Sequence, residues 1–398
     1  MNKKMKKQLF FLAIAGFFSS IASAADLYVR DLGAGGAYST ISAAITAAND
    51  GDRIIIKPKS GNVPYLENIT INKSLTFVSE TNFSRYYVQG TILIAPAVNR
   101  VVTINNMYAF QSSISTTSTT ITGGRSTINI INSIADSNFD LDNTKNVSVH
   151  VFGSECTILY FVHGEVAGNN CGRINLNNDI APLATTDVFI VGNDSGRLES
   201  STSAYAVNIL NNDISDSTGN PLVISDLKTS STNYIQNNRV VSTSYNTVQV
   251  LLSSTIPNGT IVLNNNILNT SASSSSVNKI NVNTNNATVI ANNNISSTTF
   301  NTTGVDILNN NLGNSSYTLN LTTQTATGSI VNGGLTDEEF YDLDLTINDV
   351  GPLGGSNSWA NYWPINPGNK PRISFLNTPR RIYTGTTEMN ATGSGYSK

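Results

Sequence analysis

The sequence predicts an all-β fold, a parallel β-helix solenoid of about twelve coils, because one phrase recurs along the chain. Its apolar positions alternate, which is typical of a β-strand. A pair of Asn residues then interrupts the strand and indicates a sharp corner, because Asn tolerates the left-handed backbone conformation. A propeller would instead need hairpin turns such as Asn-Gly, which are scarce here. The clearest copies of the phrase apolar, any, apolar, any, Asn, Asn, any, apolar lie at residues 174–180, 207–214, 234–240, 261–267, 289–295 and 306–312.

The first Asn of each copy is the residue that we expect at the corner. Stacked coils lie about 4.8 Å apart, so equivalent amides can hydrogen-bond along the stack as a ladder. The long step between residues 132 and 177 fits two coils, with residues 151–154 as a degenerate copy between them. With the weaker copies included, the predicted ladder residues are Asn105, Asn132, Asn177, Asn211, Asn237, Asn264, Asn292, Asn309 and Asn332.

Residues 1–24 are predicted to be a secretory signal peptide. Lysines at positions 3, 4, 6 and 7 precede an apolar run over residues 9–18 and an Ala-Ser-Ala cleavage site. The run is too short to span a membrane, so no transmembrane anchor is expected. Removal of the segment takes away four lysines and no acidic residue, which lowers the formal net charge from −3 to −7. We therefore expect a secreted or cell-surface protein, with a periplasmic location as the alternative.

Residues 25–80 are predicted to form an N-terminal cap and the first coils. Residues 25–29 alternate as a strand, and residues 39–48 place their apolar side chains on one face of a short helix that Ser39 would cap. The strand at residues 53–57 then begins the stack. We expect the helix to close the end of the solenoid, because the first coil would otherwise expose its core and an unpaired strand edge.

These phrases resemble the right-handed parallel β-helix proteins that bacteria secrete, whose fold is shared with pectate lyases. The resemblance covers roughly residues 25–355, from the entry phrase Gly51-Asp-Arg-Ile54 to the closing phrase Asn348-Asp-Val-Gly351 and its following Gly pair. It implies a single-stranded right-handed solenoid over residues 81–355. The polar tail over residues 356–398, with two tryptophans and four prolines, is expected to be a C-terminal cover segment. It does not imply one activity, because this fold hosts lyases, hydrolases and adhesins.

The composition favours a binding or structural role. Charged residues make up only 12 % of the chain, against about 25 % in average soluble proteins. The mildly acidic exported chain also argues against nucleic acid as a partner. We therefore expect a non-enzymatic protein whose long faces bind a polysaccharide or cell-surface glycan, act in adhesion, or build a matrix by end-to-end self-association.

The main alternative is a polysaccharide lyase that acts on an acidic polysaccharide by β-elimination. Elimination needs a base and a positive charge beside the uronate carboxylate. The catalytic candidates would be Arg125, Arg173 and Arg197, but they precede the predicted corner residues by 7, 4 and 14 positions, so we expect no shared face. The acids Asp187, Asp194 and Glu199 would be candidate Ca²⁺ ligands. The family's hydrolase motif Asp-Asp is absent, and the stretch His163-Gly-Glu165 lacks the leading Gly of the Gly-His-Gly motif.

Two smaller sites are expected from individual residues. Cys156 and Cys171 are the only cysteines, and export favours a disulfide between them over two separate thiols. A zinc site is not expected, because the two histidines do not cluster with them. Asp342 and Asp344 are candidate Ca²⁺ ligands, but their stretch lacks the spacing of a known calcium loop, so a solvated turn without a cofactor is favoured.

Overall fold

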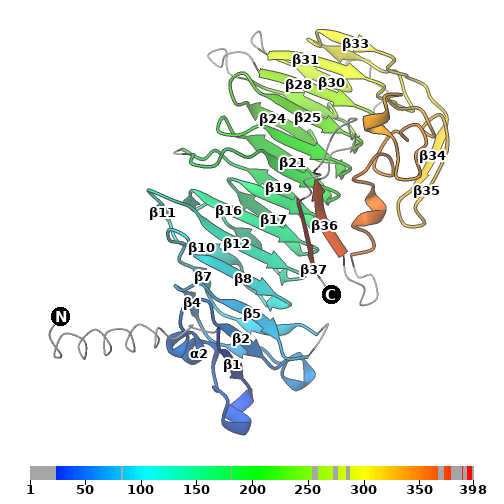
Figure 1. The fold of residues 1–398 in the computed structure, drawn as a ribbon. Helices are drawn as coiled ribbons and strands as arrows, with labels where there is room; N and C mark the ends of the chain where they lie inside the picture. Colours follow the sequence, from blue (N-terminus) through cyan, green and yellow to red (C-terminus); the bar gives the residue numbers. More distant parts are fainter. Residues whose placement is uncertain are drawn as a thin grey trace, which may run out of the picture.

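The chain folds into an all-β parallel solenoid of about eleven turns, close to the number that the sequence predicts. The strands stack along one axis, from helix α2 at one end to β33 at the other (Figure 1). No helix in the described part of the chain is long and apolar enough to cross a membrane. The predicted signal peptide lies outside the described residues except for residue 24. This computed structural model describes residues 24–81, 84–180, 182–252, 259–271, 277–283, 287–365, 372–377, 388 and 392–396.

Sheet A forms one face of the solenoid, and its strands follow one another from coil to coil. Its strands pair in parallel and in register from one coil to the next, so each side chain lies above its equivalent in the neighbouring coil. The thirteen strands are, in order, β1 (Asp26–Val29), β2 (Arg53–Ile56), β5 (Thr76–Ser79), β8 (Val101–Asn105), β12 (Ser126–Ile131), β16 (Val147–Phe152), β18 (Gly164–Ala167), β20 (Val188–Val191), β22 (Val207–Leu210), β25 (Thr232–Gln236), β28 (Gly259–Asn264), β31 (Ala287–Asn292) and β33 (Ile307–Asn309).

Sheet B forms the opposite face and consists of two columns of strands that merge in the middle coils. The merged strands are β17 (Glu155–Phe161), β19 (Asn170–Leu176) and β21 (Asp194–Ser201). The column that follows the corner also contains β3 (Tyr65–Leu66), β6 (Tyr86–Gln89), β9 (Met107–Ala109), β13 (Ile134–Ala135), β23 (Asp213–Asp216), β26 (Arg239–Ser242) and β29 (Ile267–Thr270). The second column contains β4 (Ile69–Ile71), β7 (Ile92–Ile94), β10 (Ile114–Thr116), β14 (Asn138–Asp140), β24 (Leu222–Asp226), β27 (Val248–Val250), β30 (Ile280–Val282) and β32 (Thr302–Thr303).

The remaining elements are short. Parallel strands β11 (Thr119–Thr120) and β15 (Thr144–Lys145) pair beside the stack, and β34 (Tyr317–Asn320) forms an antiparallel hairpin with β35 (Thr325–Gly328). Strands β36 (Arg372–Asn377) and β37 (Thr392–Tyr396) also pair antiparallel. The 3₁₀ turns are η1 (Asp31–Gly36), η2 (Ser60–Asn62), η3 (Glu338–Phe340) and η4 (Trp359–Asn361).

Helix α2 (Ile41–Ala47) closes the N-terminal end of the stack, as the sequence predicts. It buries Ile41 and two further apolar residues against the core. The N-cap is Thr40 rather than the predicted Ser39, because the Thr40 hydroxyl accepts a hydrogen bond from the Ala43 amide at 3.1 Å. At the other end of the helix, the Lys73 ammonium donates to three backbone carbonyl groups. A positive charge at a helix C-terminus is stabilising, so both ends of this short helix are satisfied.

From β8 onward, each corner after a sheet A strand is made by a residue in the left-handed conformation. Seven corners use Asn and three in the middle of the chain use Gly, the two residue types that adopt positive φ with the least strain. The corner residues are Asn106, Asn132, Gly153, Gly168, Gly192, Asn211, Asn237, Asn265, Asn293 and Asn310, with φ between 47° and 63°.

A buried amide ladder follows the corner residue, one position further along the chain. Each Asn side chain donates to the Oδ1 atom of the next ladder Asn at 2.8–3.0 Å and also to a backbone carbonyl group. The same Oδ1 atom accepts the backbone N–H of the preceding ladder residue. The ladder consists of Asn169, Asn193, Asn212, Asn238, Asn266, Asn294 and Asn311.

The predicted ladder residues fall into different places. Asn132, Asn211, Asn237 and Asn332 have positive φ, and the first three are corner residues. Asn264, Asn292 and Asn309 form a second, outer amide ladder with donor–acceptor distances of 2.9 Å. Asn105 ends β8 one position before the corner. Asn177 follows a sheet B strand and donates to Asp142, so the prediction of a corner there is wrong. The predicted degenerate copy at residues 151–154 does hold a corner, at Gly153, and the two corners that the sequence analysis missed follow at Gly168 and Gly192.

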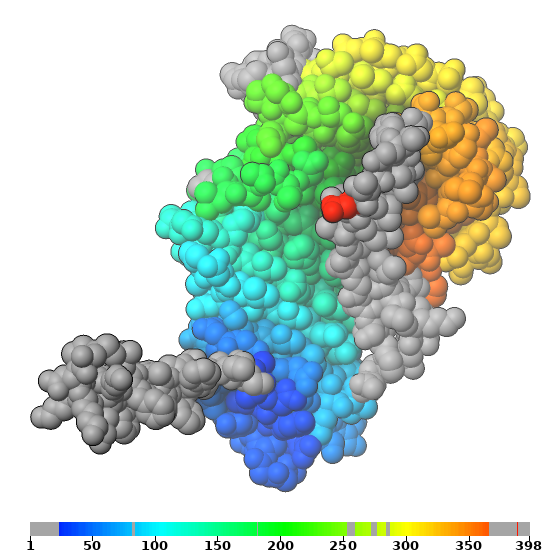
Figure 2. All heavy atoms as spheres, viewed as in Figure 1, coloured from blue at the N-terminus to red at the C-terminus, as the bar shows by residue number. Residues whose placement is uncertain are grey.

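Residues 333–363, which we call the return segment, run back along these corners. Asn237 donates to the carbonyl of Asp349 and to the side chain of Asn348, each at 2.8 Å. Asn211 donates to the carbonyls of Pro352 and Gly354. Figure 2 shows this orange part of the chain packed against the flank of the solenoid. The predicted boundary between solenoid and cover segment at residue 355 therefore lies within the return segment, which covers the flank of the stack.

Glycine corners lie where the return segment brings aromatic rings. Tyr362 packs over Gly168 and Gly192, and a Cβ atom at Gly192 would lie 2.2 Å from the Tyr362 ring. The indole N–H of Trp363 donates to the Gly192 carbonyl at 2.8 Å. The absence of a side chain at these corners is what allows the rings to approach the backbone.

Replacement of Asn238 by Leu tests the inner ladder. The substitution leaves buried donors and acceptors of Asn212 and Asn266 without partners, so we expect a loss of about 2–4 kcal/mol in the free energy of unfolding, measured by urea denaturation. The control is Asn143→Leu, at an exposed amide, which should change stability by less than about 0.5 kcal/mol. An unchanged urea midpoint for Asn238→Leu would show that the ladder does not stabilise the stack.

Replacement of Gly192 by Ala tests the packing of the return segment against the Gly192 corner. The two tryptophans of the chain both lie in this segment, so their fluorescence reports its docking. We expect Gly192→Ala to shift the emission to longer wavelength, because the new methyl group collides with Tyr362. Gly123→Ala is the matched control, since φ there is also positive, at 78°, but no atom lies within 4 Å of the added Cβ. Identical emission from both variants would contradict this packing.

Candidate functional site

Arg173 and Arg197 lie side by side on the outer face of sheet B. They are register partners on β19 and β21, and the inward-facing neighbours Ile174 and Leu198 are fully buried. The sequence-based expectation that the three arginines share no face is therefore wrong for this pair. It failed because residue 177, from which one offset was counted, is not a corner.

Three further side chains complete a group that we call the Arg patch: Tyr160, Asn175 and Glu199, with Arg173 and Arg197. Tyr160, Asn175 and Glu199 form a second outward row in register beside the arginines. Arg197 makes an ion pair with Glu199. The Asn175 residue is only 8 % exposed, yet its Oδ1 atom has no hydrogen-bond partner, and neither has the buried Nε atom of Arg197. Buried polar atoms are nearly always paired, so these two atoms are exceptions, while Arg173, Arg197 and Glu199 are partly exposed to solvent.

Asp216 adds a second carboxylate beside the Arg patch. Its burial acts to raise its pKa, but hydrogen bonds from Thr218 and the charges of Arg197 and Arg173 lower the pKa overall. Asp216 is therefore ionised at neutral pH. The two guanidinium groups and the two carboxylates of Asp216 and Glu199 together carry no net charge.

Arg125, the third candidate, lies elsewhere, in a buried polar network beside sheet A. Its Nε and Nη2 atoms donate to the Ser148 hydroxyl at 3.1 and 3.0 Å, and its Nη1 atom donates to the Tyr205 hydroxyl at 3.2 Å. The Tyr205 hydroxyl donates to the Asp179 carboxylate at 2.7 Å. Asp179 is buried and lies 4.0 Å from the Arg125 guanidinium. The sequence analysis did not single out Asp179, because it lies next to a wrongly assigned corner.

His163 extends this network and is held neutral. The Ser148 hydroxyl oxygen accepts from Arg125, so its proton is available to the His163 Nδ1 atom at 3.0 Å. The Nε2–H group of His163 then donates to the Thr186 carbonyl at 3.2 Å. Burial and the charge of Arg125 lower the pKa of His163 from 6.5 to about 4. The surrounding hydrogen bonds satisfy both ring nitrogens, and the network holds Asp179 and Thr186 against the stack.

The other two acidic candidates of the predicted lyase site are Asp187 and Asp194. Asp187 lies 3.5 Å from the Asn208 amide, and Asp213 makes a bidentate pair with Arg239 at 2.6 and 2.8 Å. Burial, followed by the charge of Asp213, raises the pKa of Asp194 to about 6. No group of three or more His, Cys, Asp or Glu residues among the described ranges is arranged to hold a metal ion.

The predicted Ca²⁺ candidates Asp342 and Asp344 form hydrogen bonds within a turn. Asp342 accepts hydrogen bonds from the backbone N–H groups of Asp349 and Gly355, and burial raises its pKa to about 6. Asp344 accepts from the backbone and hydroxyl of Thr346. These bonds fold the beginning of the return segment.

Cys156 and Cys171 are neighbours but are not joined. They are register partners on β17 and β19, and their sulfur atoms lie 3.2 Å apart as free thiols. The structure therefore differs from the predicted disulfide, although the parallel register explains why residues 15 positions apart meet. Burial raises the pKa of the Cys156 thiol well above its ordinary value.

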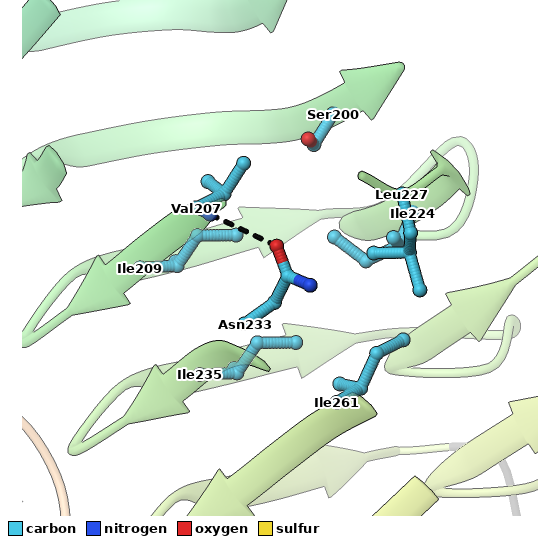
Figure 3. A pocket seen from close by; sticks show the side chains of 8 residues that line it. All are labelled: Ser200, Val207, Ile209, Ile224, Leu227, Asn233, Ile235 and Ile261. Carbon is cyan, nitrogen blue, oxygen red and sulfur yellow. Dashed lines mark hydrogen bonds between the residues drawn. The ribbon is translucent and has the colours of Figure 1, made fainter. Parts of the chain in front are cut away.

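A small cavity lies inside the solenoid, between sheet A and the strands β21 and β24. Its volume is about 10 Å³, which is at the lower limit for one water molecule, so it has no room for a sugar. Figure 3 shows its mostly apolar lining and the hydrogen bond from the Val207 amide to Asn233 Oδ1, at 2.9 Å. The lining residues are Ser200, Val207, Ile209, Ile224, Leu227, Asn233, Ile235 and Ile261.

The lowered pKa of His163 predicts that the free energy of unfolding depends on pH. The unfolded chain binds a proton at His163 below about pH 6.5, whereas the folded chain does so only below about pH 4, so stability is complete above this window and falls as pH decreases through it. The cost of His163→Gln should therefore be about 2 kcal/mol smaller at pH 5 than at pH 7. Urea unfolding of both proteins at both pH values measures this difference.

The comparison of the wild type with the His163→Gln variant isolates the contribution of His163 to the pH dependence of stability. Glu165 and Asp194 have raised pKa values and act in the opposite direction, but they do so in both proteins. An equal cost of the substitution at the two pH values would show that His163 titrates normally in the folded protein.

No protein-family model matches this chain, and neither a curated protein nor a solved structure matches it. The parallel solenoid therefore rests on the structure itself, and the likeness to secreted β-helix proteins stays a resemblance.

Proposed function

We propose that this is an exported protein that binds an extended glycan along the outer face of sheet B without cleaving it. The observation that carries this proposal is the Arg patch. It places two guanidinium groups, an amide and a carboxylate in two outward rows on neighbouring coils, where both arginines and Glu199 are partly exposed. Side chains that are held on strands need little reordering when a ligand binds.

The chemistry of the patch suits a sugar. Guanidinium and amide groups donate hydrogen bonds to hydroxyl groups, carboxylate oxygens accept them, and the Tyr160 ring adds an apolar face. The second row of the patch continues in register through Val223 to Gln249 and Asn281. The Asn281 amide donates to Gln249 Oε1 at 2.9 Å. Apart from the coil of Val223, polar groups thus recur along this row at the coil spacing of about 4.8 Å, which favours a polymer over a single sugar.

The balance of charge argues against cleavage by elimination. A lyase must neutralise the uronate carboxylate with positive charge that is free to act in the site. Here Glu199 already pairs with Arg197, and Asp216 lies near both arginines. A glycan with few or no acidic groups therefore fits this surface better than a polyuronate.

The second candidate function is a polysaccharide lyase. It is favoured by one observation, that two arginines lie side by side on neighbouring coils, which is one part of what elimination requires. Arg125 would have no part in such a site, because it belongs to the buried network.

Export is supported by the basic and apolar pattern of residues 1–24, and a secreted or cell-surface location is part of this proposal. Adhesion or a matrix role would use the same outer faces. The low content of charged residues agrees with a surface that recognises hydroxyl groups.

The combined variant Arg173→Ala and Arg197→Ala tests the binding face. A glycan array should identify ligands of the wild type, and the variant should bind them at least about tenfold more weakly, because two charge-assisted donors are lost. Arg53→Ala, at an exposed arginine that pairs with Asp26, is the matched control and should bind normally. Unchanged binding by the double variant would exclude the Arg patch. Release of an ultraviolet-absorbing unsaturated sugar from a uronate polymer, abolished by the double variant, would favour the lyase instead.

A further inference from the structure

The two ends of the solenoid are finished differently. At the N-terminal end, α2 covers the core, and the edge of β1 is occupied because Tyr38 exchanges backbone hydrogen bonds with Tyr28 and Arg30. At the other end, β33 pairs only with β31, and no strand of the described residues lies beyond it in sheet A (Figure 1). An uncapped solenoid end leaves backbone hydrogen-bonding groups free for another strand.

The last coil leaves core positions in solvent. Leu308 is the register partner of Ala291, which is fully buried, and it continues the inward-facing column of Leu263 and Ala291. Nevertheless Leu308 is 51 % exposed and the neighbouring Ile307 is 43 % exposed. Phe300 and Val305 pack against the core from this coil, but they close only part of the end.

The edge carries none of the usual protection against pairing. Natural edge strands are blunted by lysine, proline or inward-pointing charges. Residues 305–314 contain no lysine, arginine or proline, and Asp306 is their single charge. This edge is therefore open to β-augmentation.

We propose that β33 pairs with β33 of a second copy, antiparallel and about a twofold axis perpendicular to sheet A, so that two solenoids join tail to tail. The axis passes through Leu308 and keeps both Leu308 side chains on the core side. In this register Asp306 faces Asn310 of the second copy and Ile307 faces Asn309, so that no like charges meet. Each copy offers the same surface to the other, as an isologous interface requires.

This pairing limits the assembly to two copies. A head-to-tail contact would need a free edge at β1, but Tyr38 occupies that edge and α2 covers the core beside it. Tail-to-tail pairing consumes the one open edge of sheet A in each copy, so the assembly closes as a dimer and does not grow into a fibre.

The mass of the full chain in solution tests the dimer. Light scattering after gel filtration should give twice the chain mass for the wild type and the mass of one chain for Leu308→Lys. Leu66→Lys, at a 74 % exposed leucine on the edge strand β3, is the matched control and should remain dimeric. Ile307→Lys, which points away from the core, gives the same monomer without disturbing the core if Leu308→Lys fails to fold.

A wild type with the mass of one chain, a folded Ile307→Lys variant that stays dimeric, or growth beyond two copies would overturn the proposal. The register is tested with Leu308→Cys in a chain that also carries Cys156→Ser and Cys171→Ser. Mild oxidation should link two copies of this protein covalently, whereas Leu66→Cys in the same background should stay unlinked. Failure of Leu308→Cys to cross-link would contradict pairing about Leu308. Glycan binding by the Arg patch is measured separately and does not depend on this outcome.

Discussion

From β8 onward each coil turns from sheet A to sheet B at a left-handed residue, and from Gly168 onward the Asn that follows holds this turn to the next one along the axis. A corner in the interior of a stack has backbone N–H and C=O groups that no β-ladder satisfies, and leaving such groups unpaired is costly. The Asn side chain solves this because it carries both an acceptor and a donor. Its Oδ1 atom takes the backbone N–H of the preceding corner, and its Nδ2 group reaches a carbonyl and the next amide, as Asn238 does.

The residue before each ladder amide decides how the C-terminal part of the chain is held. Where the corner is Asn, as at Asn211 and Asn237, its side chain points outward and donates to carbonyl groups of the return segment. Where the corner is Gly, as at Gly192, the ring of Tyr362 takes the place of that side chain. One structural position therefore serves two purposes, because the inward amide fixes the coil and the outward group fixes the return segment.

The two clusters of polar side chains, the buried Arg125 network and the Arg patch, have different roles. The network of Arg125, Ser148 and His163 is closed, since its members satisfy one another and the histidine is kept neutral by burial. The Arg patch is open, since Arg173, Arg197 and Glu199 are partly exposed on an outer face. Unused hydrogen-bonding capacity on a rigid surface is what distinguishes a candidate binding site from a structural network. The fold alone could not make this distinction, because one solenoid architecture serves many functions.

The sequence by itself determined the fold class, most of the sheet A strands and the capped N-terminal end. These follow from local physics: alternating apolar residues form half-buried strands, Asn accepts the left-handed corner, and the apolar face of residues 41–47 must be covered. Only the tertiary structure decided the register. The spacing between successive corner residues varies from 15 to 28 positions, so no fixed period assigns residues to coils. The prediction therefore placed a corner at Asn177 and missed those at Gly168 and Gly192, where Gly hides the Asn pair. For the same reason it separated Arg173 from Arg197, because neighbours across coils are set by hydrogen bonds between strands and not by distance along the chain.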